Sequence, residues 1–169
     1  LDAVRERIAA SSRITKVMVM DELKEARETF ILTRGNYEAK TEQKVLGAIP
    51  ALFAPGGAST PRMNRLDLAR WLVSEANPLA ARTAVNRAWQ AFFGTGFVKT
   101  SEDFGVQGET PSHPELLDWL ARDYIDSGWN TKALHRLIVT STIYRQSSRT
   151  TPTLQERDPE NRLLARGPR

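Results

Sequence analysis

From Asn64 onward, apolar residues return every three or four positions, which is the spacing of one face of a helix. Four such runs each follow a residue that commonly caps a helix N-terminus: Asn64, Asn77, Ser112 and Asn130. Gly94 and Gly128 follow two of the runs, where glycine commonly ends a helix. This pattern predicts four helices within residues 64–144, packed as one compact bundle.

The two central helices are predicted in the most detail. The first is expected to begin at Asn77-Pro78, with the proline at the first helical position, and to run to Phe93. The next is expected to open with a capping box in which Ser112 and Glu115 satisfy each other's backbone N–H groups. Two apolar rows should then face the core: Leu116, Leu120 and Tyr124, and beside them Leu117, Ala121 and Ile125.

Before Asn64 the pattern changes to short runs with strand character. Ile14–Met20 and Thr29–Thr33 are rich in β-branched and aromatic residues, which favours an antiparallel strand pair or an extended arm on the helical core. The charged stretch between them is rich in helix formers, so a helix across residues 16–28 is a competing interpretation. Residues 35–63 hold several prolines and glycines and are expected to form a loop.

The composition is that of an ordinary globular domain, with 40% hydrophobic and 26% charged residues in a chain of 169. The chain has no cysteine, which excludes disulfides, thiolate metal sites, cysteine nucleophiles and CxxCH haem attachment within this sequence. No apolar run approaches the roughly 20 residues that span a bilayer. The first residue is Leu1 and no signal-peptide pattern follows it, so we expect a fragment of a larger protein.

Positive charge gathers near the C-terminus. Residues 129–169 carry a net charge of +5, so the rest of the chain sums to −1. We expect a loop-rich basic tail that docks on an acidic surface of the parent protein, with an anionic partner as the alternative. The predicted helices 112–127 and 131–141 have helix-turn-helix proportions, yet only Lys132, His135 and Arg136 suit a recognition helix. Nucleic acid is therefore not the expected partner.

The residues that could carry chemistry are few. The two histidines, His113 and His135, lie on separate predicted helices, and a catalytic zinc site normally needs three protein ligands. We therefore expect no metal site. No GxSxG nucleophile motif is present. A glycosidase-like carboxylate pair can be drawn from Glu102, Asp103 and Glu109, but sequence spacing does not fix the separation that such a pair needs.

If the chain has a functional site, the glycine-rich loop Gly94–Pro111 and the helix start at Ser112–Glu115 are where we expect it, because binding residues tend to lie on loops held by a rigid scaffold. The candidate binding residues are Asn86, Arg87, Glu102, Asp103, Glu109 and His113, with Gln107 beside them. The alternative interpretation is structural: Glu102 and Asp103 cap the loop or pair with Arg87. No residue is assigned a catalytic role.

A series of motifs from Asn64 to the end of the sequence resembles a known family. The motifs are NRLDLARWL from Asn64, VNRAWQ from Val85, EDFG from Glu102, PSHPELLDWL from Pro111 and DPENRLLARGPR from Asp158. Together they resemble the planctomycete-type domain of unknown function that is found toward the C-terminus of large, exported, cytochrome-c-associated proteins. The resemblance is dense from Asn64 to Arg169 and weaker over Thr15–Pro50.

The resemblance implies an extracytoplasmic parent protein whose haem lies in a separate module, with no cofactor in this fragment. We expect a mainly α fold with an N-terminal arm (1–63), a helical core (64–150) and a C-terminal extension (151–169). The expected function is that of a structural or interaction domain whose partners are other domains of the parent chain. The alternative is a catalytic or carbohydrate-processing domain, with a carbohydrate ligand at the 94–115 loop. A nucleic-acid-binding module is a distant third.

Overall fold

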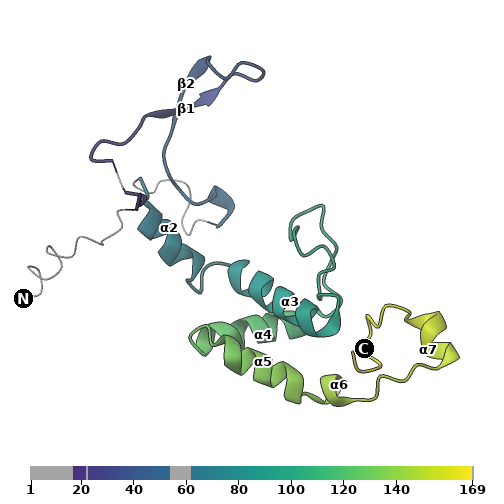
Figure 1. Cartoon of the computed structure of the whole chain (residues 1–169). Helices are drawn as coiled ribbons and strands as arrows, with labels where there is room; N and C mark the ends of the chain where they lie inside the picture. Colours follow the sequence, from purple (N-terminus) through teal and green to yellow (C-terminus); the bar gives the residue numbers. More distant parts are fainter. Residues whose placement is uncertain (1–16, 22, 54–61, 169) are drawn as a thin grey trace, which may run out of the picture. The chain divides into compact units, whose positions relative to one another are not determined.

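The computed structural model describes residues 17–21, 23–53 and 62–168. Contacts within the chain divide it into two units, Leu1–Leu46 and Gly47–Arg169, and each unit is described by itself. Short strands occur in the first unit and helices in the second (Figure 1), so the chain is mainly α, as predicted. The domain boundaries drawn from the sequence at residues 63 and 150 stay predictions.

The first unit contains a hairpin of two antiparallel strands, β1 (Thr29–Leu32) and β2 (Lys40–Val45). The strand at Thr29 was predicted, but the predicted pairing with Ile14–Met20 is wrong. Residues 17–20 have no regular structure and their side chains are exposed, while residues 14–16 lie outside the described part. The competing helix is also not formed by the described residues between 17 and 28.

The strand β2 has no apolar alternation to reveal it, because both faces of the hairpin are largely exposed and its side chains are mainly polar. Cross-strand contacts hold it instead. The Lys44 ammonium pairs with Glu28, and the Lys40 ammonium lies 5.5 Å from the centre of the Phe30 ring. The Thr41 hydroxyl donates to the Ile31 carbonyl at 2.8 Å.

In the second unit, a short 3-10 helix (Ala51–Phe53) precedes α2 (Arg65–Leu72). The predicted cap at Asn64 is confirmed: its side chain accepts from the Asp67 N–H, and Asp67 accepts from the Asn64 N–H, both at 3.0 Å. No residue of α2 is buried. The Trp71 ring lies 6.2 Å from that of Phe53, so this helix packs on the 3-10 helix before it.

The helix α3 (Ala80–Phe93) begins two residues later than predicted. The cap position is Leu79, which has no side-chain capping bond, so the predicted N-cap at Asn77 is wrong. The Asn77 side-chain oxygen accepts from the backbone N–H groups of Leu79 and Ala80, each at 2.9 Å, in the turn before the helix. The helix ends where predicted, at Gly94. The backbone φ of Gly94 is +83°, which residues other than glycine rarely adopt.

The helix α4 (Pro114–Asp126) lacks the predicted capping box, which is therefore wrong. The helix starts at Pro114, so His113 and not Ser112 occupies the cap position, and His113 makes no capping bond. Ser112 faces the preceding loop instead: its N–H donates to the Phe97 carbonyl at 2.9 Å. The predicted cap of α5 (Thr131–Thr140) is confirmed, since the Asn130 side chain accepts from the Ala133 N–H at 3.0 Å.

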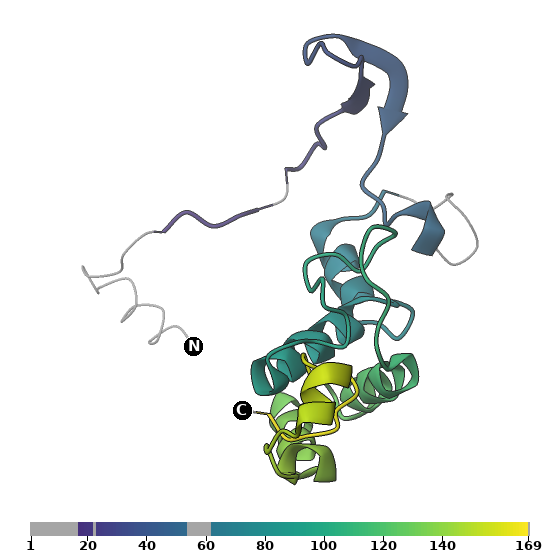
Figure 2. The ribbon, with the colours of Figure 1, turned by 90° about the vertical axis from the view of Figure 1, so that its right-hand side faces the viewer.

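The hydrophobic core lies where α3, α4 and α5 meet (Figures 1 and 2), and the loop between α3 and α4 adds two residues to it. Its buried members are Ala81, Val85, Trp89, Phe97, Val98, Leu117, Leu120, Ala121, Tyr124, Leu134 and Ile138. The predicted apolar rows of α4 thus supply the core, with Leu116 and Ile125 at its edge. The Trp89 ring stacks on Phe93 with centres 4.1 Å apart and contacts Phe97 at 4.2 Å.

Two short helices, α6 (Thr142–Arg145) and α7 (Pro152–Arg157), follow α5. Among the described residues, no helix is long and apolar enough to cross a membrane.

An ion pair joins the outer surfaces of α3 and α4. Arg82 Nε lies 2.6 Å from the Asp118 carboxylate, and both side chains are partly exposed. The hydrogen bond from Arg82 lowers the pKa of Asp118 below its ordinary value, and desolvation opposes it. A carboxyl whose pKa is lowered on folding stabilises the protein above its unfolded pKa, and this contribution is lost as the pH falls through the folded pKa.

We therefore expect Asp118→Asn to reduce the acid sensitivity of the fold. The difference in unfolding free energy between the original chain and this variant should be below about 1 kcal/mol near neutral pH, because the pair is exposed. This difference in unfolding free energy should shrink further as the pH falls below about 4. Urea titrations of both proteins between neutral pH and acid pH measure the difference. Asp123→Asn, at an exposed position of the same helix, is the control; an equal effect of the two variants would contradict the assignment.

Candidate functional site

The loop from Gly94 to His113 is tied to α3 by the side chain of Asn86. This side chain is completely buried. Its amide oxygen accepts from the Val98 N–H and its amide nitrogen donates to the Val98 carbonyl, both at 2.9 Å. Asn86 therefore gives Val98 the two backbone partners that a neighbouring strand would otherwise supply.

The same network includes two further polar side chains. The Asn86 amide also donates to the Ser101 hydroxyl at 3.2 Å, and that hydroxyl donates to Gln90 Oε1 at 2.7 Å. The loop passes so close to Asn86 that a Cβ at Gly96 would lie 2.6 Å from its amide nitrogen. Only glycine fits there, so the absence of a side chain at position 96 allows the loop to approach α3 this closely.

The outer half of the loop is closed by short-range hydrogen bonds. The Asp103 carboxylate accepts from the Gly105 N–H at 2.7 Å, as a turn cap. The Thr100 hydroxyl donates to the Asp103 carbonyl and accepts from the Glu109 N–H, both at 2.9 Å. Asp103 therefore shapes the loop, which is the structural alternative considered from the sequence.

The other candidate residues do not converge. The side chains of Arg87, Glu102 and Glu109 are exposed, and in the part of the chain that the structure describes none of them bonds to another candidate. His113 is half-buried, with its ring 6.3 Å from that of Phe97 and its Nδ1 3.0 Å from the Ser112 hydroxyl. The predicted pairing of an acidic loop residue with Arg87 is not formed.

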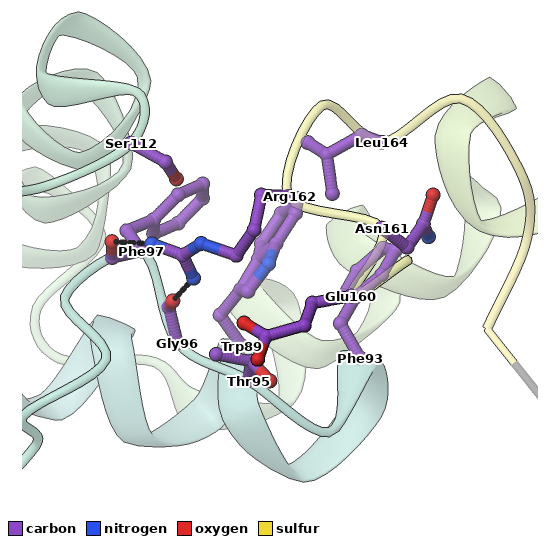
Figure 3. A pocket seen from close by; sticks show the side chains of 10 residues that line it. All are labelled: Trp89, Phe93, Thr95, Gly96, Phe97, Ser112, Glu160, Asn161, Arg162 and Leu164. Carbon is purple, nitrogen blue, oxygen red and sulfur yellow. Dashed lines mark hydrogen bonds between the residues drawn. The ribbon is translucent and has the colours of Figure 1, made fainter. Parts of the chain in front are cut away.

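A C-terminal segment covers one side of this loop. We call Asp158–Gly167 the strap (Figure 3). The Arg162 guanidinium donates to the carbonyls of Gly96 and Phe97 at 2.6 and 2.9 Å. These two carbonyls lie more than 60 residues before Arg162 in the sequence, so the contact joins two segments that are far apart in the chain.

The strap also holds its own shape. The buried Asp158 carboxylate accepts from the N–H groups of Arg162 and Leu163 at 2.6 and 2.8 Å. The Arg166 guanidinium donates to the carbonyls of Asp158 and Pro159, at 3.0 and 2.7 Å. Asn161 bonds to both backbone groups of Arg166. Two arginines of the predicted basic tail are thus bound to backbone carbonyls of this chain.

The space between strap and loop is nearly filled. It offers a free volume of about 10 Å³, and side chains of Trp89, Phe93, Glu160 and Arg162 line it (Figure 3). Such a volume admits one water at most. The Gly96 and Phe97 carbonyls at the start of the loop are therefore covered by the chain's own arginine, and their geometry is suited to binding a guanidinium on two carbonyl oxygens.

Metal ligands do not gather in the described part of the chain, where no three His, Asp or Glu side chains lie close enough to hold an ion. The expected lack of a cofactor stays a prediction.

Sequence reasoning missed the residues that hold this region. Arg162, Asp158 and Ser101 were not singled out, and Asn86 was considered only as a binding residue. One signal was available for the strap: Asp158 and Asn161 lie at turn-forming positions beside Pro159 and before Arg162. The spacing along α3 does not show that Asn86 faces a loop and not solvent.

Two adjacent residues of α3 give a direct test. We expect Asn86→Ala to lower the unfolding free energy by about 3 kcal/mol, because it leaves buried backbone groups of Val98 without partners. Arg87→Ala, at an exposed position, should change it by less than about 0.5 kcal/mol. Chemical denaturation measures both. Equal effects of the two substitutions would overturn the structural role of Asn86.

The chain was compared with protein families, curated proteins and solved structures. Neither the curated proteins nor the solved structures gave a match. The family model PSD1, described as a protein of unknown function (DUF1553), matches residues 64–169, which are α2, the core helices, the loop and the strap. On this match the chain belongs to the PSD1 family of proteins of unknown function.

Proposed function

We propose that residues 64–169 act as a structural and interaction domain, which binds other domains of an exported, cytochrome-c-associated parent protein. The observation that carries this proposal is an apolar groove lined by residues of α3, α4 and α5 and by residues at the start of α6. Its lining residues are Trp89, Leu116, Trp119, Leu120, Leu137, Ile138, Ser141 and Ile143. Its free volume is about 120 Å³, which is enough for an inserted apolar side chain.

The chemistry of the groove favours a polypeptide partner. Trp119 is 56% exposed at its edge, although large aromatic side chains are commonly buried. Besides the indole N–H groups of Trp89 and Trp119, the lining residues offer the Ser141 hydroxyl, which already donates to the Ile138 carbonyl at 2.6 Å. A sugar would find few hydrogen-bond partners here, whereas a buried apolar side chain needs none.

The polar groups at the loop support the same proposal. Asn86, Ser101 and Asp103 satisfy groups of their own loop, and Arg162 covers the Gly96 and Phe97 carbonyls. Their hydrogen bonds are used to maintain the fold. This arrangement suits a scaffold more than a site that must exchange a substrate.

The cellular setting of the proposal comes from the family resemblance. It implies an extracytoplasmic parent, with haem in a module other than this one. The domain would then bind neighbouring modules of its own chain through the groove, with no cofactor of its own.

The substitution Trp119→Gln in the full-length parent tests the groove. We expect it to lower the melting temperature of the parent by several degrees, because it removes an interdomain anchor. In the isolated chain the same change should cost less than about 0.5 kcal/mol, since the side chain is largely exposed. Differential scanning calorimetry measures both.

Val106→Gln is the matched control, because Val106 is a fully exposed apolar residue outside the groove. This control should leave the melting temperatures of the full-length parent and of the isolated chain unchanged. Equal melting temperatures for the parent and its Trp119→Gln variant would refute the groove as the contact. A glycan-degrading activity lost on Glu102→Gln or Glu109→Gln would refute the assignment as a scaffold.

A further inference from the structure

We propose that the strap is exchangeable between two copies of this chain, so that the loop of one copy binds the strap of the other and a dimer forms. We call the acceptor surface the seat: the carbonyls of Gly96 and Phe97, the Lys99 ammonium and the rings of Trp89 and Phe93. The proposal does not depend on the function proposed above.

The seat recognises features that any copy of the strap carries. The planar Arg162 guanidinium bonds two successive carbonyls, a geometry that lysine does not reproduce. Beside it, Lys99 forms an ion pair with Glu160 at 3.0 Å. Leu164 packs against the edge of the core and its carbonyl accepts from Gln146 Nε2 at 2.8 Å. A strap from a second copy would make the same contacts.

The strap is a preformed unit. Asp158, Asn161 and Arg166 bond within it and fix its turns without help from the seat. A segment that keeps its shape loses less conformational entropy on binding than a disordered one. It can therefore rebind in another copy at little cost.

The arm that leads to the strap is weakly attached. Residues 148–157 are exposed except Leu154, which is half-buried. The hydrogen bonds of the arm in the described structure are local, such as those that the Thr151 hydroxyl and carbonyl accept from the N–H groups of Leu154 and Gln155. The arm consists of residues 148–151 and the helix α7, which together reach roughly 20 Å. The arm can therefore change direction and span to a neighbouring copy without breaking contacts with the core.

Exchange of an identical element replaces each internal contact by the same contact between copies, so it costs little and becomes favourable as the protein concentration rises. The Lys99–Glu160 pair allows this to be tested with two exposed residues, whose side chains are 46% and 53% exposed. Lys99→Glu places two carboxylates across the strap, and Glu160→Lys places two ammonium groups there. Each variant alone therefore has a repulsive pair when its strap lies on its own seat.

When the two variants are mixed, strap exchange restores attraction at both seats. In one seat the carboxylate introduced by Lys99→Glu faces the ammonium introduced by Glu160→Lys, and in the other seat the original Lys99 faces the original Glu160. We expect native mass spectrometry of a concentrated mixture, with one variant isotope-labelled, to find more than half of the dimer as heterodimer. The mixture should also dimerise more than either variant alone.

The matched control is Lys44→Glu mixed with Glu28→Lys. This pair lies within the hairpin and has similar exposure, 49% and 64%. It should give no excess of heterodimer over the random half. Strap exchange would be overturned if the Lys99→Glu and Glu160→Lys mixture stayed monomeric at every concentration. It would also be overturned if heterodimers made up only half of the dimers, as random association gives.

Discussion

The fold of the helical unit depends on the two hydrogen bonds between the Asn86 side chain and the backbone of Val98. An amide side chain is one of the few groups that can supply both a donor and an acceptor to a single residue of a loop. At a fully buried position this pairing removes the cost of dehydrating two backbone groups. It fixes the chain after α3 at one place on the helix, and Gly96 leaves the room for it.

The strap depends on that placement. The carbonyls of Gly96 and Phe97 point at Arg162 because the residue next to Phe97 is held by Asn86. Phe97 at the same time packs within the core, against the Trp89 ring. A single buried amide therefore links α3, the loop and a segment more than 60 residues away. This explains why Asn86, which resembles a binding residue in the sequence, supports the loop in the structure.

The helices could be predicted because their signals are local. Caps at Asn64 and Asn130 and the glycine after Phe93 act within one turn, and the apolar rows of α4 report burial directly. The start of α4 could not be placed from Ser112 and Glu115 alone, because the helix begins at Pro114, one residue later than that capping box predicts, and Ser112 bonds to Phe97 instead. The hairpin was paired wrongly because Lys40–Val45 is mainly polar on both faces.

The candidate site shows a different limit. Asn86, Asp103 and His113 all lie in or beside the loop, and their hydrogen bonds are made to groups of that loop. Sequence spacing did not show that Asn86 faces inward, because helical periodicity alone does not distinguish a buried polar residue from an exposed one. Nor did it show Arg162, whose partners are backbone atoms distant in sequence and identical for every residue type.

The most direct test of this account is a double-mutant cycle between Asn86→Ala and Arg162→Ala. The two side chains share no hydrogen bond, and they interact through the backbone at residues 96–98. If Asn86 positions the seat, the two losses of unfolding free energy should fall short of additivity by about 1 kcal/mol or more. Losses that add to within about 0.3 kcal/mol would contradict the dependence of the strap on the buried amide.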